Sequence, residues 1–293
     1  MKLIESKVEL IEQQPGLEGV YKQIELAGRT CYKSEDKITE DSAKGFVDRM
    51  INSKHGAMLE HGTVYLTAYD NYAEDLLKYQ TNKYSKYKSY TEYLEDGKSI
   101  KVCVTTNLRV LVENNWLDDL KYIGVPTELH EKRITARFTC DMGVGRELTR
   151  HRTLSFAQES TRYCNYSKSK FGEELTFVIP TWLDRLRPGD EYGISQVGNG
   201  YDPRYIFIHT CNVIEEQYMK LIKLGHKPQE ARQILPLGLK TEIVVTGFES
   251  DWEHFFELRT AKSAHPDCVK LAVELKQKLT DNGYEFNGNL ENN

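Results

Sequence analysis

The segment from residue 145 to residue 163, GRELTRHRTLSFAQESTRY, most strongly restricts how this chain can fold. Its nineteen residues contain only two carboxylates and four arginines, namely Arg146, Arg150, Arg152 and Arg162. Guanidinium groups that lie close together repel one another unless an anion neutralises them, and their planar fork matches phosphate and carboxylate oxygens two at a time. We therefore expect the segment to form the binding site of a small anion.

The overall charge of the chain limits the kind of partner. The 293 residues carry a formal net charge of −5. A general nucleic-acid surface needs a more extended basic footprint, so we expect no specific nucleic-acid binding. The hydrophobic content of 39% and the charged content of 28% are ordinary for a globular protein. Because no break in composition marks a linker and no repeat is present, we expect a single domain over residues 1–293.

The apolar runs and the N-terminal sequence predict neither a membrane span nor export. No apolar run approaches the roughly 20 residues that a membrane helix needs. The first fifteen residues, MKLIESKVELIEQQP, carry three glutamates within their apolar stretch, unlike a signal peptide. We therefore expect a cytoplasmic protein without membrane association. The six cysteines are scattered and contain no CxxC pair, which argues against a disulfide framework and against a bound metal.

The order of the expected elements indicates an α+β fold. Strands are predicted by TVYLTAY from residue 63, ITARFTC from 134, LTFVIP from 175 and TEIVVTGF from 241, and VCVTTNLRVLVENN from 102 indicates a strand followed by a helix. Apolar periodicity predicts helices over 39–56, around 214–225 and over 268–279. A further helix is predicted where the turn at 141–145 leads into the arginine-rich segment. Two more are predicted between Pro228 and Pro236 and after a capping box of Ser250 and Glu253. Loops are predicted from Ser155 onward and over 184–204, and the tail from residue 285 is expected to fray. Because strands and helices do not alternate strictly, a doubly wound sheet is disfavoured.

Three further groups of residues are candidates for the same site. Arg232 lies in the short helix between two prolines, and Arg259 lies on an amphipathic helix. Just before the strand predicted from residue 63 lies a cluster of three residues, His55, Glu60 and His61. Each also has an ordinary interpretation: a helical arginine commonly pairs with a surface carboxylate, an isolated histidine is commonly a satisfied core residue, and a glutamate can be solvated. The arginine-rich segment itself could be a salt-bridged helix face.

Taken together, the motifs resemble those of flavin-dependent thymidylate synthase. The central signature is Arg150-His151-Arg152 followed, after seven residues, by Ser160. The other matching segments cover most of the chain in order; they are GRTCY at 28–32, LEH at 59–61, QESTRY at 158–163, ARQILP at 231–236 and LR at 258–259. No Gly-rich dinucleotide fingerprint is present, so composition alone does not indicate a flavin.

The resemblance implies a fold, a reaction and an assembly. The fold is α+β, with a central, mostly antiparallel sheet flanked by helices. The reaction converts dUMP to dTMP, with methylenetetrahydrofolate as carbon donor and with NADPH reducing a bound FAD, so that the enzyme is an FAD-dependent methyltransferase. The assembly is a homotetramer whose active sites form at subunit junctions.

The resemblance also implies which residues bind each molecule. The residues assigned to dUMP are Glu147, Arg150, Gln158, Glu159, Ser160, Thr161, Arg162, Arg232 and Arg259. The residues assigned to FAD are Cys31, His55, Ala57, Glu60, Arg150, His151, Arg152, Gln158 and His254. Arg259 is placed to donate to the pyrimidine carbonyls, and Ser160 is the second residue assigned to catalysis. We interpret Ser160 as a substrate ligand, because the segment offers no Asp-oriented histidine to activate its hydroxyl.

The chain departs from the family pattern at several positions. Glu147 stands where some relatives have Gln, and a carboxylate near a phosphate is unfavourable unless a cation such as Arg150 pairs with it. Ala57 stands where relatives often have Ser or Thr, and Phe248 replaces a frequent Asn. About 70 residues, roughly 69–133 by motif spacing, are added relative to compact members. An oligomer contact, a lid and a surface addition are the alternatives for that insertion.

Two other functions are compatible with parts of the sequence. An RNA-binding module could use the arginine-rich segment and the Tyr-rich stretch between Tyr65 and Tyr93, although the acidic net charge opposes it. Another nucleotide enzyme, such as a phosphatase or nucleotide hydrolase, needs a metal-binding carboxylate cluster, and none occurs at a recognisable spacing. We therefore predict the flavin-dependent enzyme of dTMP biosynthesis.

Overall fold

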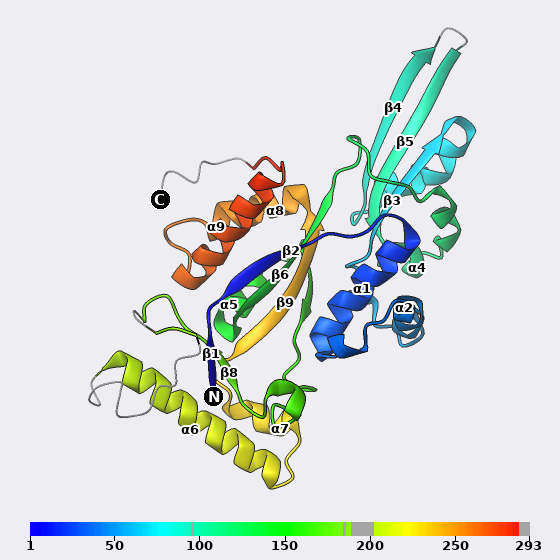
Figure 1. Cartoon of the computed structure of the whole chain (residues 1–293). Helices are drawn as coiled ribbons and strands as arrows, with labels where there is room; N and C mark the ends of the chain where they lie inside the picture. Colours follow the sequence, from blue (N-terminus) through cyan, green and yellow to red (C-terminus); the bar gives the residue numbers. More distant parts are fainter. Residues whose placement is uncertain (95–96, 184–185, 189–201, 287–293) are drawn as a thin grey trace.

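The central sheet consists of four strands that come from distant parts of the chain (Figure 1). The computed structural model describes residues 1–94, 97–183, 186–188 and 202–286. In spatial order the four strands are β2 (Lys7–Ile11), β6 (Arg133–Asp141), β9 (Lys240–Phe248) and β7 (Ser155–Gln158). Every neighbouring pair is antiparallel. The α+β class and the antiparallel central sheet predicted from the sequence are confirmed.

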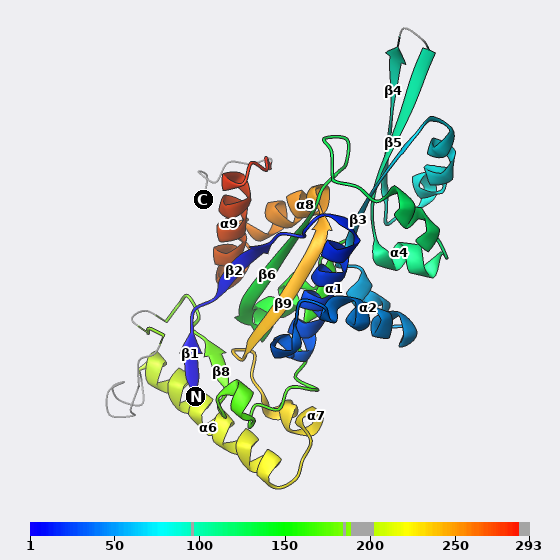
Figure 2. The same cartoon turned by 45° about the vertical axis from the view of Figure 1, so that its right-hand side comes forward.

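Helices cover both faces of this sheet, as Figures 1 and 2 show. The helices α8 (Glu249–Arg259) and α9 (Pro266–Asp281) pack on one face, and α1 (Gly16–Tyr32) and α2 (Ser42–Asn52) lie on the other. The central strand β9 supplies both cores, because Ile243 and Val245 face α8 and α9 whereas Val244 faces the core of α1 and α2. Alternate residues of a strand point to opposite faces, so the middle of β9, which is covered on both sides, is an unbroken apolar run from Ile243 to Val245.

Helix α1 was not among the helices predicted from the sequence. Its buried Val20, Ile24 and Ala27 recur at helical spacing. Gly28 of the same helix faces the ring of Phe46 on α2, and a Cβ at that position would overlap the ring. The glycine of the GRTCY segment therefore permits the two helices to approach closely.

A second sheet lies apart from the central one and has the strand order β3–β5–β4. Its strands are β3 (Thr63–Tyr69), β4 (Lys86–Leu94) and β5 (Gly97–Asn107), and the remaining elements of this segment are η2 (Asp70–Thr81), α4 (Leu108–Glu113) and η3 (Leu117–Tyr122). The strand from residue 63 and the strand-then-helix from 102 are confirmed. Both views show the hairpin of β4 and β5 projecting from the rest of the molecule (Figures 1 and 2).

A third layer surrounds the short parallel pair of β1 (Lys2–Ile4) and β8 (Thr176–Val178). Its helices are α6 (Pro203–Lys223) and α7 (Pro228–Ala231), and α7 continues into the 3₁₀ turn η6 (Arg232–Ile234). The remaining elements are η1 (Glu35–Lys37), α3 (Gly56–Leu59), α5 (Met142–Leu148) and η4 (Ser169–Phe171). None of the described helices combines the length and apolar character needed to cross a membrane.

The loop predicted from Ser155 onward is wrong at its start, because residues 155–158 form strand β7. Phe156 and Ala157 pair with Val245 and Val244 of β9, and Ala157 is buried in the core. The strand forms because these two apolar residues pair with β9, although the sequence around them is polar. The loop predicted over 184–204 and the frayed tail from 285 fall mostly outside the described residues.

The capping box predicted from Ser250 and Glu253 is also wrong. Helix α8 begins two residues earlier than that box implies, with Phe248 as its N-cap, and the Asp251 carboxylate accepts a hydrogen bond from the Phe248 backbone N–H at 3.1 Å. The Ser250 hydroxyl instead donates to Glu131 at 2.5 Å. The contact with Glu131 spans more than one hundred residues, and local spacing cannot reveal it.

Candidate functional site

Arg162 and Arg232 come together with Thr161 and Gln229 in what we call the paired-arginine cluster. Arg162 Nε donates to Gln229 Oε1 at 3.4 Å, and Arg232 Nη1 donates to Thr161 Oγ1 at 3.5 Å. Thr161 and Arg162 follow β7 in the sequence. Gln229 lies in α7, and Arg232 is the first residue of η6. Two segments that the family motif treats separately therefore meet in this structure.

The charges of the paired-arginine cluster are not compensated within the described part of the chain. Neither Arg162 nor Arg232 forms an ion pair there, and both side chains are exposed. Among the described residues, the hydrogen bonds of both go to neutral side-chain oxygens, and Arg162 also lies 5.3 Å from the centre of the Tyr163 ring. Two neighbouring guanidinium groups without a carboxylate partner form a site that a phosphate or carboxylate stabilises.

Ser160 connects this cluster to the C-terminal end of α1. Its backbone N–H donates to the Cys31 carbonyl oxygen at 2.9 Å. The ring of Tyr163 packs edge-on against Tyr32 at 5.6 Å, and Tyr32 Oη lies 3.3 Å from His55 Nδ1. Three residues assigned by resemblance to different ligands, Cys31, His55 and Ser160, are therefore linked through backbone and ring contacts. Ala57 follows closely and is exposed on α3.

Glu60 forms hydrogen bonds with two arginines that follow it in the sequence, Arg109 and Arg133. Its carboxylate accepts from Arg109 of α4 at 2.5 Å, and its backbone carbonyl accepts from Arg133 at 2.8 Å. The Glu60 carboxylate is already neutralised by Arg109. Its contacts instead connect the FAD-assigned segment at residues 55–61 with the elements of the second sheet.

Arg259 forms a second group with Glu147 and His151, which we call the Arg259 cluster. Arg259 Nε donates to His151 Nε2 at 2.8 Å, Nη1 donates to the Glu147 carboxylate at 2.7 Å, and Nη2 donates to the Glu147 carbonyl oxygen at 2.9 Å. Arg150 adds a longer contact to the same carboxylate, at 3.5 Å. The expectation that Glu147 needs a paired cation is met, and Arg259 is the nearer of the two.

The protonation states within the Arg259 cluster follow from these contacts. The hydrogen bond from Arg259 lowers the pKa of Glu147, so the carboxylate is charged at neutral pH. Burial, together with the charge of Arg259, lowers the pKa of His151 to about 4. Because arginine can only donate, His151 Nε2 must be unprotonated when it accepts from Arg259. His151 is therefore a neutral imidazole with its proton on Nδ1.

The remaining arginines and His254 surround the Arg259 cluster at the surface. Arg150 is 71% exposed at its side chain, and Arg152 is exposed without an ion pair among the described residues. The ring of His254 on α8 lies 6.4 Å from that of His151, in an edge-on arrangement. Helix α5 ends at Leu148, so the turn that follows it, and not a helix face, presents Arg150 and Arg152.

Glu159 and Gln158 are directed into the protein and not toward either cluster. The buried Glu159 carboxylate accepts from Lys240 at 2.8 Å and from Tyr166 at 3.2 Å. Gln158 Nε2 donates to Thr241 Oγ1 at 3.2 Å. Within this chain their side chains therefore fix the position of the segment that carries Ser160 and Thr161.

A charge network beneath Glu159 was missed from the sequence. Lys240 lies 2.6 Å from Glu242, and Lys33 lies 3.1 Å from the same carboxylate. Burial would raise the pKa of Glu242, but the two lysines outweigh that effect and lower it to about 2. The sequence signal is weak, because Lys240 and Glu242 alternate on one strand and Lys33 lies more than two hundred residues away.

The structure thus divides the candidate residues into two groups. No hydrogen bond or ion pair among the described residues joins the paired-arginine cluster, with its Cys31 and His55 neighbours, to the Arg259 cluster. Residues 1–94, 97–183, 186–188 and 202–286 also contain no group of three His, Cys, Asp or Glu side chains placed to hold a metal ion. The motif residues of a single chain therefore form two clusters that are not bonded to each other within its described part.

His61 differs from the other candidates because it is a core residue. It is fully buried, and its Nδ1 lies 2.8 Å from Thr246 Oγ1 on β9. Burial, with a smaller contribution from the charge of Arg133, lowers its pKa to about 3. This environment supports the ordinary interpretation of an isolated histidine as a core residue, although its buried Nε2 has no hydrogen-bond partner among the described residues.

Lowering the pH from 7 to 5 is expected to destabilise the fold, because His61 takes up a proton in the unfolded chain but not in the folded one. Its contribution is complete above the unfolded pKa of 6.5 and is lost as the pH falls toward about 3. The loss is at most about 1.4 kcal/mol per pH unit. Urea denaturation at pH 7, 6 and 5 measures the free energy of unfolding.

The control compares His61 with an exposed histidine; His151, whose pKa is also lowered, contributes in the same pH range and is unchanged in both variants. His61→Gln should reduce this pH dependence, whereas His226→Gln, which changes an exposed histidine, should leave it intact. Because the first variant also alters the core, the NMR resonance of His61 in the unaltered protein gives an independent measurement. A His61 resonance that titrates above pH 5 in the folded state contradicts the assignment.

Comparisons with known proteins point to one family. The family model described as Thymidylate synthase complementing protein (Thy1) matches residues 77–282, which is more than half of the chain. The flavin-dependent thymidylate synthase of Corynebacterium glutamicum is 31% identical over 143 residues, which cover 45% of this chain and 51% of the relative. The enzyme of the same name from Mycobacterium avium is 29% identical over 141 residues, which cover 46% and 52%. The chain therefore spans about half the length of the curated relatives it matches.

A solved structure with a related arrangement is a UMP/dUMP methylase, PolB from Streptomyces cacaoi, bound with 5-Br dUMP. It has a TM-score of 0.44 and 20% sequence identity, over 96% of this chain and 93% of that chain. The same methylase bound with 5-Br UMP has a TM-score of 0.44 and 16% identity, over 96% and 92%.

Proposed function

Because the chain belongs to the thymidylate synthase complementing protein family, we propose that it converts dUMP to dTMP by reductive methylation at C5 of the uracil ring. Methylenetetrahydrofolate is the proposed carbon donor, and NADPH is the proposed source of the hydride, carried by FAD. The observation that supports this function best is the paired-arginine cluster. It joins two motif segments into a site for an anion and contains no carboxylate.

We assign the dUMP phosphate to the paired-arginine cluster. Arg162 and Arg232 supply the charge, and the hydroxyls of Ser160 and Thr161 lie in the same turn. Arginine binds phosphate oxygens through two parallel N–H groups, which fixes orientation as well as charge. The Ser160 hydroxyl has no hydrogen-bond partner or base among the described residues, which supports its assignment as a ligand and not as a nucleophile.

We assign the pyrimidine carbonyls to Arg259. The contacts with Glu147 and His151 use three of its five N–H groups, which leaves one on each terminal nitrogen. The guanidinium is thereby held in one orientation before the substrate arrives. For C5 of the uracil to act as a nucleophile toward the methylene carbon, negative charge must first build up on the ring and its oxygens, and a fixed cation beside those oxygens stabilises that charge electrostatically.

The cysteines support a reaction without a thiolate nucleophile. Burial raises the pKa of Cys31 to about 11, and burial together with Glu159 raises that of Cys164 to about 12. These are the two cysteines nearest the proposed substrate site in sequence and contacts. A thiol attacks as its thiolate, and neither side chain provides one at neutral pH.

Four of the residues assigned to FAD fit such a group in charge or exposure. Arg150 and Arg152 are exposed cations suited to a diphosphate, and His55 and Ala57 form an exposed edge on and beside α3. When bound, FAD supplies the redox chemistry that passes the hydride to the substrate. Because no hydrogen bond or ion pair joins the two groups within the described part of one chain, we propose that they meet across subunit junctions of a homotetramer.

The test is formation of dTMP by the purified protein. Supplied with FAD, NADPH, dUMP and methylenetetrahydrofolate, it should form dTMP, and omission of any one component should abolish the product. Purified protein should also absorb at about 450 nm and bleach on addition of NADPH. UMP offered in place of dUMP identifies the preferred substrate. A protein that cannot be reconstituted with FAD, or that forms no methylated nucleotide, contradicts the proposal.

A further inference from the structure

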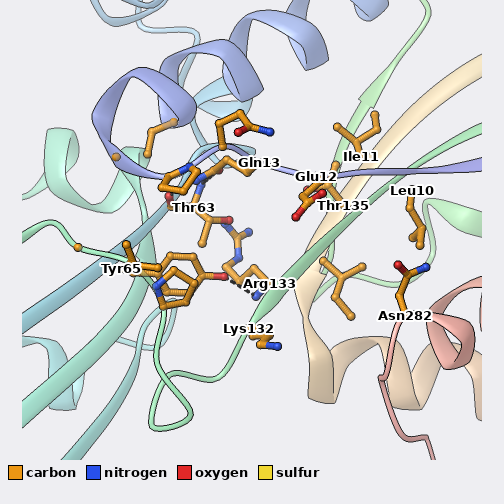
Figure 3. Close-up of a pocket in the computed structure, with 18 of the residues that line it drawn as sticks. Leu10, Ile11, Glu12, Gln13, Thr63, Tyr65, Lys132, Arg133, Thr135 and Asn282 are labelled. Atoms are coloured by element: carbon orange, nitrogen blue, oxygen red, sulfur yellow. Dashed lines mark hydrogen bonds between the residues drawn. The ribbon is translucent and has the colours of Figure 1, made fainter.

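A pocket of about 590 Å³ lies where the second sheet joins the rest of the molecule (Figure 3). It is lined by the end of β2, the start of α1, the start of β3, the loop after η3, the start of β6 and the end of α9. We call it the root pocket. None of its lining residues belongs to the paired-arginine cluster or to the Arg259 cluster. Its volume is typical of sites for small organic ligands.

Arg133, at the start of β6, lies in the middle of the root pocket, between Tyr65 and Thr63 on one side and Glu12 on the other (Figure 3). Its Nη1 donates to the Glu60 carbonyl at 2.8 Å and makes a longer contact with the Thr63 hydroxyl at 3.4 Å. Its Nε is inaccessible to solvent and has no hydrogen-bond partner among the described residues. Arg133 also forms no ion pair within the described chain.

This guanidinium is only partly compensated: Glu60 and Asp251 act on it without forming an ion pair, and it lies 5.4 Å from the centre of the Phe248 ring. Burial lowers the pKa of Arg133 to about 10, so the group still carries its charge at neutral pH. A buried charge without a counter-ion, and a buried N–H without an acceptor, each cost free energy. An anion in the root pocket would offset the first of these costs.

Two further features favour an anion in the same place. Lys132 lies at the rim, with its Nζ 5.3 Å from the centre of the Tyr284 ring. Gly16 lines the pocket at the start of the seventeen-residue helix α1, which has no side-chain cap. The first N–H groups of an uncapped helix carry partial positive charge and can donate hydrogen bonds to an anion. Glu12 is the one acidic residue in the lining, against two basic ones.

The walls of the root pocket indicate the rest of the ligand. Tyr65 and Tyr284 provide aromatic surface, and Leu10, Ile123 and Val125 provide aliphatic surface. Gln13 is not available as a ligand, because its amide makes two hydrogen bonds of 2.8 Å with the backbone of Thr63. These two bonds tie the end of the N-terminal strand segment to β3, so the pocket exists before any ligand binds.

We propose that the root pocket binds a small organic anion that carries a carboxylate or phosphate group on a flat, apolar body. The anionic group pairs with Arg133 and Lys132 beside the start of α1, and the apolar body lies between Tyr65 and Tyr284. The site is separate from the proposed substrate site, which involves the opposite end of α1 at Cys31.

The test uses two fluorinated probes, 4-fluorobenzoate and 4-fluorophenyl phosphate, observed by ¹⁹F NMR with the full chain. Saturating dUMP is present to fill the proposed substrate site, and the ionic strength is held constant. At least one probe should bind, and inorganic phosphate or unlabelled benzoate should compete with it. The probe that binds more tightly identifies the preferred anionic group.

Variants of the two basic residues locate the binding. Arg133→Lys should weaken it at least about tenfold, because a buried charged hydrogen bond is lost. Lys132→Gln, at an exposed position, should weaken it several-fold and leave the melting temperature unchanged, which keeps the test valid if Arg133→Lys does not fold. The double variant Arg162→Ala/Arg232→Ala should bind the probes as the unaltered protein does.

Three results overturn the proposal. The first is that neither probe binds at millimolar concentration. The second is that probe binding is unchanged in Lys132→Gln and in folded Arg133→Lys. The third is that the double variant of the paired-arginine cluster abolishes probe binding, which places the probes in the substrate site.

Discussion

Replacing Arg259 with alanine is expected to lower the rate of dTMP formation by about two to three orders of magnitude. That is the usual effect of removing one preorganised donor from a site where charge develops. The side chain is held by three hydrogen bonds to Glu147 and His151, so it needs no reorganisation during the reaction. The measurement is kcat and KM for dUMP, with dTMP quantified directly.

Two further variants separate a direct role of Arg259 from a structural one. Arg259→Lys keeps the charge but loses the fork, and it should recover only part of the rate. Glu147→Gln removes the carboxylate that orients Arg259 and should reduce the rate by less than the alanine variant does. Circular dichroism spectra and melting temperatures establish whether each variant is folded. A folded Arg259→Ala enzyme with kcat within about threefold of the unaltered protein excludes the assigned role.

The Arg259 cluster shows how far the sequence predicts a site. In the structure Glu147 and His151 share Arg259 as a partner. The need for a cation beside Glu147 followed from its charge alone. The identity of that cation did not, because Arg259 lies 112 residues away and no local pattern encodes such a contact.

The environment of Glu159 shows where prediction from sequence stops. The motif placed this carboxylate with the dUMP ligands, whereas within the chain it pairs with Lys240 and Tyr166. Burial of a charge is decided by which strand lies beneath it, and here that strand is β9. Strand β7 was missed for the same reason: its pairing with β9 offsets a polar local sequence.

The second sheet was predicted only in part. The alternating residues of β3 and the apolar run of β5 predicted those two strands. The Lys- and Tyr-rich sequence of β4 did not predict a strand. Strand β4 is an edge strand with one neighbour, and its side chains are largely exposed. Such strands carry little hydrophobic signal, and lysines on them discourage pairing with other chains.

Replacing Arg232 with alanine is expected to raise KM for dUMP by roughly 10- to 100-fold, because a charged hydrogen bond to phosphate is lost. Arg162→Ala should have a similar effect, since both residues belong to one cluster. The reaction rate at saturating dUMP should change much less, because neither residue is placed at the reacting carbon. Arg49→Ala removes an exposed arginine of α2 and serves as the matched control.

Deoxyuridine, which lacks the phosphate, distinguishes this role from a general loss of activity. In the unaltered enzyme kcat/KM should be far higher for dUMP than for deoxyuridine. If Arg232 binds the phosphate, Arg232→Ala lowers kcat/KM for dUMP and leaves that for deoxyuridine unchanged, so the ratio falls. A variant that loses activity equally on both substrates has lost something other than a phosphate contact. That outcome would place the phosphate elsewhere and remove the main structural support for the proposed function.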